Sequence, residues 1–235
     1  MHRSAIRAVE VNVEKLKQIA VVLCGSGFKD GSEIHESVAV LWALSQHPVQ
    51  VQCFAPDAPQ ANVVNCLTGH VAPMEKRNML IEAARIARGQ ILALDQLKVA
   101  DFDAIILPGG FGAAKNLCDF AVNGANGSVR ADLQGILEAF HARHKPIGAV
   151  CIAPALIALA FRHKGFDLTL GAAGSAADAV VALGHRHTVT RADQALVDRE
   201  NKVVTTPAYM HDDASLHEVF EGIRKAMASV VALAS

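Results

Sequence analysis

The sequence predicts an α/β protein with a single open, doubly wound and mostly parallel β-sheet that carries helices on both faces. Short runs made almost wholly of apolar residues, such as 18–24 and 103–107, are typical of strands buried on both faces of a parallel sheet. Segments in which apolar residues recur at helical spacing lie between these runs. This alternation of strands and helices predicts the fold class.

Length and composition limit the classes of protein that the chain can be. Its 235 residues are enough for one domain with a substantial core, and 51% hydrophobic against 19% charged residues argue against disorder. A formal net charge of -1 provides no basic field for nucleic acid or a membrane surface. No run approaches the roughly 18 apolar residues that a membrane-spanning helix needs. We therefore expect neither a nucleic-acid nor a membrane partner.

The five cysteines are scattered along the chain, with no CxxC pair and no paired framework. An odd, dispersed set of thiols suits a reducing compartment. Residues 1–13 carry His2, Arg3 and Arg7 but no apolar core of the secretory type, so an organelle-targeting segment stays open as the alternative. We expect a cytoplasmic protein with an N-terminal extension over residues 1–17 and one domain over residues 18–235.

The first half of the chain predicts four strands and two helices. The run 18–24 is the first strand, and a loop with three glycines follows it to Ser32, which is a suitable helix N-cap. Apolar side chains at helical spacing extend the next helix to about residue 45. Segment 62–70 fits neither pattern. The remaining runs predict strands at 49–55, 91–94 and 103–107 and a helix at 78–88.

The second half continues this alternation around a short buried strand that ends at Val150. Segment 123–128 is rich in glycine and asparagine and is expected to be a surface loop. Segments 195–198 and 203–206 resemble the two strands of a hairpin. Helical patterns lie at 113–117, 133–144, 154–161, 175–183 and 213–233, with one further small strand at 168–170.

Three of the predicted strands end in residues that could carry chemistry. Cys24, the Gly109–Gly110 pair and Cys151 each follow a buried apolar run. In an open doubly wound sheet the binding crevice lies outside the carboxyl ends of the strands. The sequence therefore predicts that these residues meet at one edge of the sheet.

Cys151 lies where a strand turns directly into a helix. A helix N-terminus offers free N–H groups and a partial positive charge, which favour a thiolate nucleophile. Backbone N–H groups of Gly110 and Ile152 could then form an oxyanion hole. Local sequence alone leaves two alternatives open, namely a buried structural cysteine and a Pro-Gly-Gly segment that is only a tight turn.

A nucleophilic thiol needs a proton partner, and Glu33 is the candidate in the first turn of the helix after the first strand. If protonated beside the sulfur, its carboxyl could donate a hydrogen bond and relay a proton. On residue type alone, Glu33 and Glu36 are better explained as acidic residues that favour a helix start.

No cofactor or metal is predicted. The glycine-rich segments lack the residues of a P-loop, and Asp30 stands where a dinucleotide motif requires its third glycine. His185 and His187 have metal-like spacing, but no carboxylate or cysteine nearby completes a site.

Four segments together resemble the glyoxalases of the enhancing lycopene biosynthesis protein 2 family, amidotransferase-like members of the DJ-1/PfpI superfamily. The resemblance covers about residues 18–233. It rests on the motifs CGSG with DGSEIHE (24–36), LPGGFGAAKNL (107–117), GAVCIAP (148–154) and VVTTPAYM (203–210).

This resemblance implies a flavodoxin-like, class I glutamine amidotransferase-like sandwich with Cys151 on a nucleophile elbow. It implies Glu33 as the acid beside the thiol, with Glu36 one turn further as the fallback. The implied activity is the cofactor-independent conversion of glyoxal to glycolate through a hemithioacetal, which could reflect removal of early glycation adducts from proteins. It also implies a homodimer and attaches a link to isoprenoid biosynthesis, which no residue explains.

Differences from the motifs of other members of the superfamily reduce the number of activities that we expect. Ile152 stands where the peptidases carry a histidine, and no His-x-Glu pair follows Cys151, so peptidase and glutamine amidotransferase activities are disfavoured. A third catalytic residue is not evident, and His187 is a weak candidate. Alternatives are a redox sensor or chaperone-like protein with an oxidisable Cys151, and a hydrolase or amidase acting on another small carbonyl compound.

Overall fold

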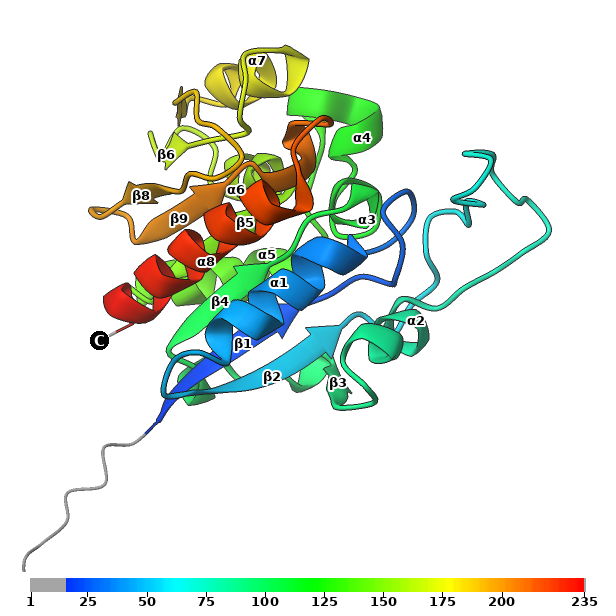
Figure 1. The fold of residues 1–235 in the computed structure, drawn as a ribbon, viewed down its shortest axis with the longest axis horizontal. Coiled ribbons are helices and arrows are strands. Elements are labelled where there is room, and N and C mark those ends of the chain that lie inside the picture. Colours follow the sequence, from blue (N-terminus) through cyan, green and yellow to red (C-terminus); the bar gives the residue numbers. More distant parts are fainter. Residues whose placement is uncertain (1–15, 235) are drawn as a thin grey trace, which may run out of the picture.

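The fold is a seven-stranded sheet with helices on both faces, which confirms the predicted class (Figure 1). The computed structural model describes residues 16–234. The strand order is β3-β2-β1-β4-β5-β9-β8, and every neighbouring pair is parallel except β8 with β9. The strands of this sheet are β1 (Lys17–Val22), β2 (Val49–Ala55), β3 (Ile91–Ala93), β4 (Ala104–Leu107), β5 (Ile147–Val150), β8 (Leu196–Asp198) and β9 (Val203–Thr206).

The helices connect these strands. They are α1 (Ile34–Leu44), α2 (Met79–Ile86), α3 (Phe111–Lys115), α4 (Phe120–Asn123), α5 (Ala131–Ala142), α6 (Ala153–Ala160), α7 (Ser175–Ala182) and α8 (Leu216–Leu233), with short 3-10 turns η1 (Leu94–Gln96), η2 (Val99–Asp101), η3 (Gly124–Asn126) and η4 (Ala208–Met210). A separate two-stranded sheet pairs β6 (Asp167–Leu168) with β7 (Arg186–His187). No helix within residues 16–234 is both long and apolar enough to cross a membrane.

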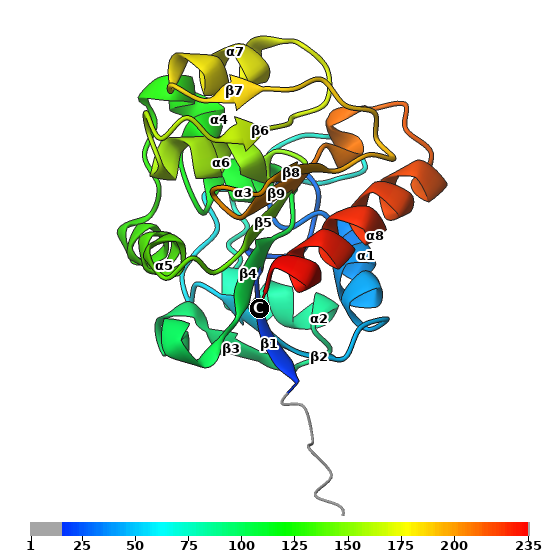
Figure 2. The same cartoon turned by 90° about the vertical axis from the view of Figure 1, so that its left-hand side faces the viewer.

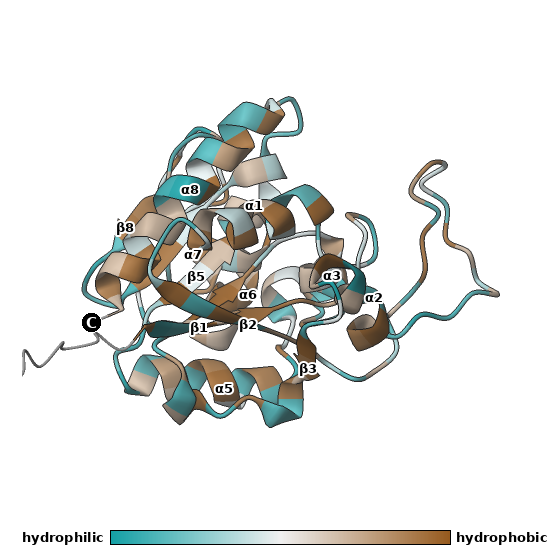
Figure 3. Ribbon diagram, turned by 60° about the horizontal axis from the view of Figure 1, so that its bottom comes forward, coloured by the Kyte–Doolittle hydropathy of each residue, from teal (hydrophilic) through white to brown (hydrophobic). Residues whose placement is uncertain are grey.

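The core lies on both sides of the sheet because alternate residues of each strand point to opposite faces. In β1, Ile19 and Val21 belong to the cluster under α1 and α8, whereas Ala20 and Val22 belong to the cluster under α5 and α6. Figure 2 shows these two helical layers on either side of the strands. In Figure 3, α5 and α8 alternate between brown and teal, as expected of helices with one buried and one solvent-facing side.

The start of α1 differs from the prediction in a way that matters for the site. The N-cap is Glu33, whose carboxylate accepts a hydrogen bond of 2.6 Å from the Glu36 N–H, and not Ser32. Ser32 is buried and its hydroxyl instead accepts from the Cys24 N–H at 2.9 Å. The helix therefore begins one residue later than predicted.

The boundaries of other elements also differ from the predicted ones. The closing helix begins at Leu216 because Ser215 and Glu218 form a capping box, not at 213. Segment 62–70, which fitted neither pattern, lies in an extended arm held by a bridge between Val64 and Val71. The predicted loop 123–128 begins with the last residue of the short helix α4 and includes the 3-10 turn η3. Of the predicted extension, residues 1–15 lie outside the described range, and Lys17 already belongs to β1.

One buried histidine in this fold predicts a pH-dependent stability. His185 accepts a hydrogen bond from the Phe166 N–H through Nδ1, and its Nε2 bonds the Ala158 carbonyl oxygen, each at 3.1 Å. This arrangement needs a neutral ring, and burial lowers the pKa of His185. The neutral ring contributes fully to the free energy of unfolding above the unfolded-state pKa near 6.5. This contribution is lost as the pH falls below that value.

We expect the free energy of unfolding, measured by urea denaturation, to fall between about pH 7.5 and about pH 5.5. The fall should be smaller in His185→Gln, which has no titrating ring at this position. His217→Gln, an exposed change on α8, is the matched control and should behave like the wild type. An equal fall in His185→Gln would contradict the assignment.

Candidate functional site

Cys151 lies on a strained turn between β5 and α6. Its φ is 62°, in the left-handed region that side chains other than glycine rarely adopt. Such strain costs on the order of 1 kcal/mol or more and persists where the surrounding structure enforces it. Here the Cys151 N–H donates to the Thr206 carbonyl oxygen of β9 at 2.9 Å, and Ile152 forms the N-cap of α6. The predicted elbow geometry is present.

The turn after β4 approaches Cys151 so closely that it requires glycine. A Cβ at Gly109 would clash with the Cys151 side chain, the Glu36 carboxyl and the Val150 carbonyl oxygen. Gly110 has a φ of 97°, which favours glycine. The Gly109 carbonyl oxygen accepts from the Glu33 N–H at 2.9 Å, so this turn also fixes where α1 begins.

Glu36 is the carboxyl that lies against the thiol. It is 0% exposed, and one of its oxygens, Oε1, accepts from the Tyr209 N–H at 3.3 Å. Its second oxygen, Oε2, has no hydrogen-bond partner within residues 16–234 and lies against Gly109 together with the Cys151 side chain. Burial, followed by the charge of Glu33, raises the pKa of Glu36 to about 8, so the carboxyl is largely protonated at neutral pH.

The thiol does not have the lowered pKa that the sequence predicts. Burial, and then the charge of Glu36, raise the pKa of Cys151 well above its ordinary value. The backbone N–H groups of Gly110 and Ile152 lower the pKa of Cys151, because they favour the anionic sulfur. The helix N-terminus therefore lowers the pKa of the thiol by less than burial beside a carboxylate raises it. The two side chains titrate as a coupled pair.

Glu33, the predicted acid beside the thiol, has a different position. Its carboxylate caps α1 and lines the cavity, and burial raises its pKa. The acid in contact with Cys151 is the fallback residue, Glu36. The physical reason is that the cap holds the Glu33 carboxylate on the backbone of its own helix, while the first turn directs Glu36 into the protein interior.

A cavity of about 690 Å³ opens onto the thiol. Gly110 and Ile152, the predicted oxyanion-hole residues, both line it. Its lining consists of Phe28, Lys29, Glu33, His35, Gly110, Phe111, Cys151, Ile152, Tyr209, Met210 and Asp212. Sequence reasoning assigned no role to Tyr209, although it lies in the last of the four motifs, and its importance follows only from the fold.

His187, the weak third candidate, lies elsewhere. It is in β7, where Nε2 accepts from the Leu170 N–H at 3.0 Å, and it does not line the cavity. The structure therefore does not bring it to Cys151. Within residues 16–234, no cluster of three or more His, Cys, Asp and Glu side chains is placed to hold a metal ion.

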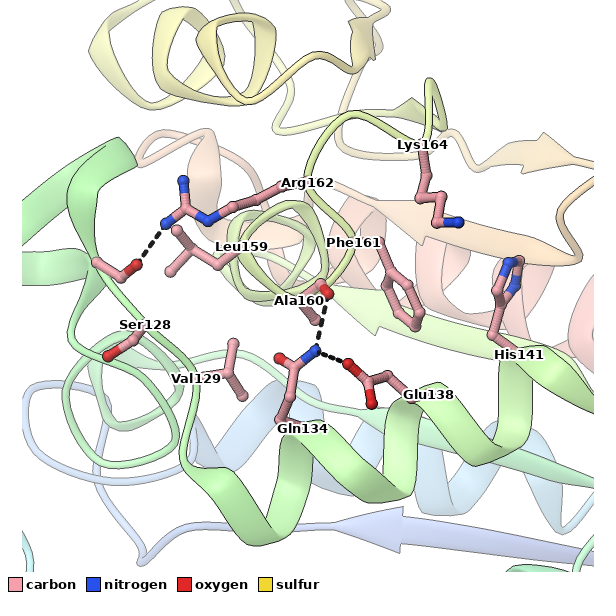
Figure 4. Close-up of a pocket in the computed structure, with 11 residues that line it drawn as sticks. Ser128, Val129, Gln134, Glu138, His141, Leu159, Ala160, Phe161, Arg162 and Lys164 are labelled. Atoms are coloured by element: carbon pink, nitrogen blue, oxygen red, sulfur yellow. Dashed lines mark hydrogen bonds between the residues drawn. The ribbon is translucent and has the colours of Figure 1, made fainter.

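A second cavity, of about 650 Å³, lies beside α5 and the end of α6 (Figure 4). Gln134 bonds Glu138 at 2.6 Å and the Ala160 carbonyl oxygen at 2.9 Å, and Arg162 bonds the Gly127 carbonyl oxygen. The side chains of Gln134 and Arg162 thus have hydrogen-bond partners within the protein, and no cysteine lines the cavity. The Cys151 cavity is therefore the stronger candidate site.

Known structures share this arrangement of elements. The crystal structure of an isoprenoid biosynthesis protein with an amidotransferase-like domain from Ehrlichia chaffeensis superposes with a TM-score of 0.86 at 34% identity, covering 93% of this chain and 100% of that one. Drosophila melanogaster DJ-1beta superposes at 0.56 with 17% identity over 94% of this chain and 96% of that one, which shows a common fold. The fold and site thus define an amidotransferase-like protein whose fold is shared with DJ-1beta.

Sequence relatives identify the family within this class. The rat "ES1 protein homolog, mitochondrial" is 46% identical over 92% of this chain and 84% of its own length. The human "glutamine amidotransferase-like class 1 domain-containing protein 3, mitochondrial" is 46% identical over 92% and 83%. The chain belongs to this ES1 family of amidotransferase-like proteins. No family profile matches it.

These relatives overturn one expectation. The rat, human and zebrafish proteins are all described as mitochondrial, so the expectation of a cytoplasmic protein is wrong. Scattered free cysteines indicate only that the surroundings are reducing. Such a composition does not distinguish the cytoplasm from an organelle whose proteins also keep free thiols.

The coupling of Glu36 to the thiol predicts how Cys151 reacts with pH. In the wild type, the rate of Cys151 alkylation by iodoacetamide should keep rising with pH above about 9, because the thiolate is the nucleophile. Glu36→Gln removes a neighbouring negative charge and should shift this rise to lower pH. Mass spectrometry of the alkylated peptide measures the rate. Glu75→Gln, an exposed change, should leave the profile in place; an unshifted profile in Glu36→Gln would show that the carboxyl does not act on the sulfur.

Tyr209 is the only tyrosine in the chain, so its titration can be followed directly. Burial, and then the charges of Glu33 and Glu36, raise the pKa of its phenol. Ultraviolet absorbance of tyrosinate should therefore give a midpoint above the usual value of about 10. Glu33→Gln removes one of the anions and should lower this midpoint; an unchanged midpoint would place the Glu33 charge too far away to matter.

Proposed function

We propose that the protein is a cofactor-independent glyoxalase-type enzyme that converts glyoxal, or a related α-oxoaldehyde, to the hydroxy acid. The observation that carries this proposal is that the Cys151 side chain and the buried Glu36 carboxyl pack side by side against Gly109, with Cys151 lining an open cavity. Thiol addition to an aldehyde needs a nucleophile and a group that takes its proton, and this pair can provide both.

The first step follows from the coupled titration. The ionised fraction of Glu36 takes the thiol proton as the sulfur attacks the aldehyde carbon, so the thiolate does not have to exist free beside a carboxylate. The oxygen of the tetrahedral product would accept hydrogen bonds from the N–H groups of Gly110 and Ile152, two residues that line the cavity beside Cys151. Glu36 then passes this proton to that oxygen, which gives the neutral hemithioacetal and restores the carboxylate.

The remaining steps move hydrogen within the substrate. A proton leaves the carbon bound to sulfur and one is added to the neighbouring carbon, so the first carbon is oxidised and the second reduced without an external cofactor. The resulting thioester of the hydroxy acid is hydrolysed by water, which regenerates the thiol. Overall, one water is added to the dialdehyde.

The dimensions of the cavity bear on the substrate. A volume of about 690 Å³ exceeds what a two-carbon aldehyde needs and lies in the range typical of larger ligands. Phe28 and Phe111 in its lining are 41% and 48% exposed, so the cavity is accessible from solvent. Larger α-oxoaldehydes, or a glycated side chain of another protein, are therefore included in the proposed substrate class.

The competing proposal is a redox sensor or chaperone-like protein that uses Cys151 without turnover. Peroxide reacts with the thiolate, and the raised pKa of Cys151 disfavours that form. Cys66, in contrast, is exposed to solvent. Mass spectrometry after mild peroxide treatment separates the two proposals, because a sensor would oxidise at Cys151 ahead of Cys66.

Glyoxal turnover tests the main proposal. Incubation of the pure protein with glyoxal should form glycolate, and Cys151→Ser should abolish the reaction. Glu36→Gln should lower the rate by about 10²-fold or more, as expected for loss of a general acid–base group. Glu33→Gln should have a smaller effect, because its carboxylate caps a helix. Cys66→Ser is the matched thiol control and should retain the wild-type rate; an undiminished rate in Cys151→Ser would overturn the proposal.

The expected homodimer stays a prediction. An apolar row along the outer side of α1 consists of Ile34, Val38 and Trp42, which are 45%, 44% and 42% exposed. The name of the Ehrlichia protein concerns isoprenoid biosynthesis. The thiol chemistry proposed for this site provides no physical basis for such a role.

A further inference from the structure

The cavity that holds Cys151 also contains a hydrogen-bonded tyrosine and histidine. His35 Nδ1 and Tyr209 Oη are 2.9 Å apart, and both residues line the cavity. His35 is the second residue of α1, and Tyr209 belongs to η4 after β9, 174 positions further along the chain. Neither residue takes part in the addition of the thiol to the aldehyde.

Two features of the backbone fix the position of Tyr209 in the site. Ala208, immediately before it, is fully buried and has a φ of 45°, an unfavourable conformation for a residue with a side chain. The Tyr209 N–H then donates to Glu36 Oε1, while the phenol lies in the cavity lining. One residue therefore holds the acid that contacts the sulfur and also presents a hydroxyl to the substrate space.

The proposed reaction needs a second proton-transfer group away from the sulfur. In the hemithioacetal of an α-oxoaldehyde, the carbon bound to sulfur carries the hydrogen that must move, and the neighbouring carbon carries the outer carbonyl oxygen. Glu36 is buried at the sulfur. Removal of the hydrogen leaves electrons that are stabilised only if the outer oxygen accepts a proton or a strong hydrogen bond.

We infer that Tyr209 is a further catalytic residue, whose hydroxyl donates a proton to the outer carbonyl oxygen of the Cys151-bound hemithioacetal, and that His35 positions that hydroxyl. The inference rests on the proposed function. This role requires the His35 tautomer in which Nδ1–H donates to the phenol oxygen, which leaves the phenol hydrogen free for the substrate. The phenol is protonated at neutral pH, as a donor must be, because its ordinary pKa is about 10 and burial raises it further.

The protons balance over the two groups. The Glu36 carboxylate takes the hydrogen on the carbon bound to sulfur as Tyr209 protonates the outer oxygen, which gives an enediol. Glu36 then returns its proton to the outer carbon, and the hydroxyl on the carbon bound to sulfur returns one to the tyrosinate. The product is the thioester of the hydroxy acid, and both side chains regain their starting states.

Tyr209→Phe separates this role from a structural one, since the backbone N–H that holds Glu36 is kept. With glyoxal, hydroxy acid formation should fall about 10²-fold, the effect typical of a lost general acid. The covalent glyoxal adduct on Cys151, seen by mass spectrometry of the intact protein, should accumulate. Alkylation of Cys151 by iodoacetamide should be unchanged. His35→Gln should show the same pattern with a smaller fall in turnover.

His47→Gln is the matched histidine control, because His47 lies beyond the opposite end of α1 from the site, and it should turn over like the wild type. Full turnover in Tyr209→Phe would overturn the inference. A parallel loss of alkylation and turnover would also overturn it, because it would indicate a structural role. If turnover depends on Cys151 but not on Tyr209, the proposed function stands and only this inference fails; if the wild type forms no hydroxy acid, both fail.

Discussion

The site depends on a buried carboxyl and a buried thiol held in contact. Neither Glu36 nor Cys151 is stable there as an anion beside the other, because burial removes the water that would solvate the charges. The pair therefore behaves as a unit that holds one or two protons. This constraint explains why the surrounding backbone is so specialised, with a positive φ at Cys151 and a glycine turn packed against both side chains.

Three strand ends have to cooperate to maintain that contact. The turn after β4 accepts a hydrogen bond from Glu33 and so sets the start of α1, which in turn carries Glu36. The end of β9 accepts from the Cys151 N–H, and the following turn supplies the N–H of Tyr209 to Glu36. Parallel neighbours place all these ends at one edge of the sheet, so the site is a consequence of topology as much as of its side chains.

The electrostatics of the site favour chemistry that begins with proton transfer. A thiol with a strongly lowered pKa would react readily with peroxide as well as with aldehydes. A thiol whose proton leaves only to an adjacent carboxylate reacts when a suitable carbonyl carbon is in place. The same argument applies to Tyr209, whose phenol stays protonated in the field of Glu33 and Glu36. Aldehyde processing accords with these properties better than redox sensing does.

Much of this protein could be predicted from its sequence, because the signals involved are local. Apolar runs and helical spacing indicated the parallel sheet, the β8–β9 hairpin and the strand ends where Cys151, Gly110 and Ile152 lie together. The choice between Glu33 and Glu36, the raised pKa of the thiol and the place of Tyr209 were decided only by the tertiary structure. Capping, burial and contacts between residues more than 170 positions apart determine these features, and no local pattern of residue types records them.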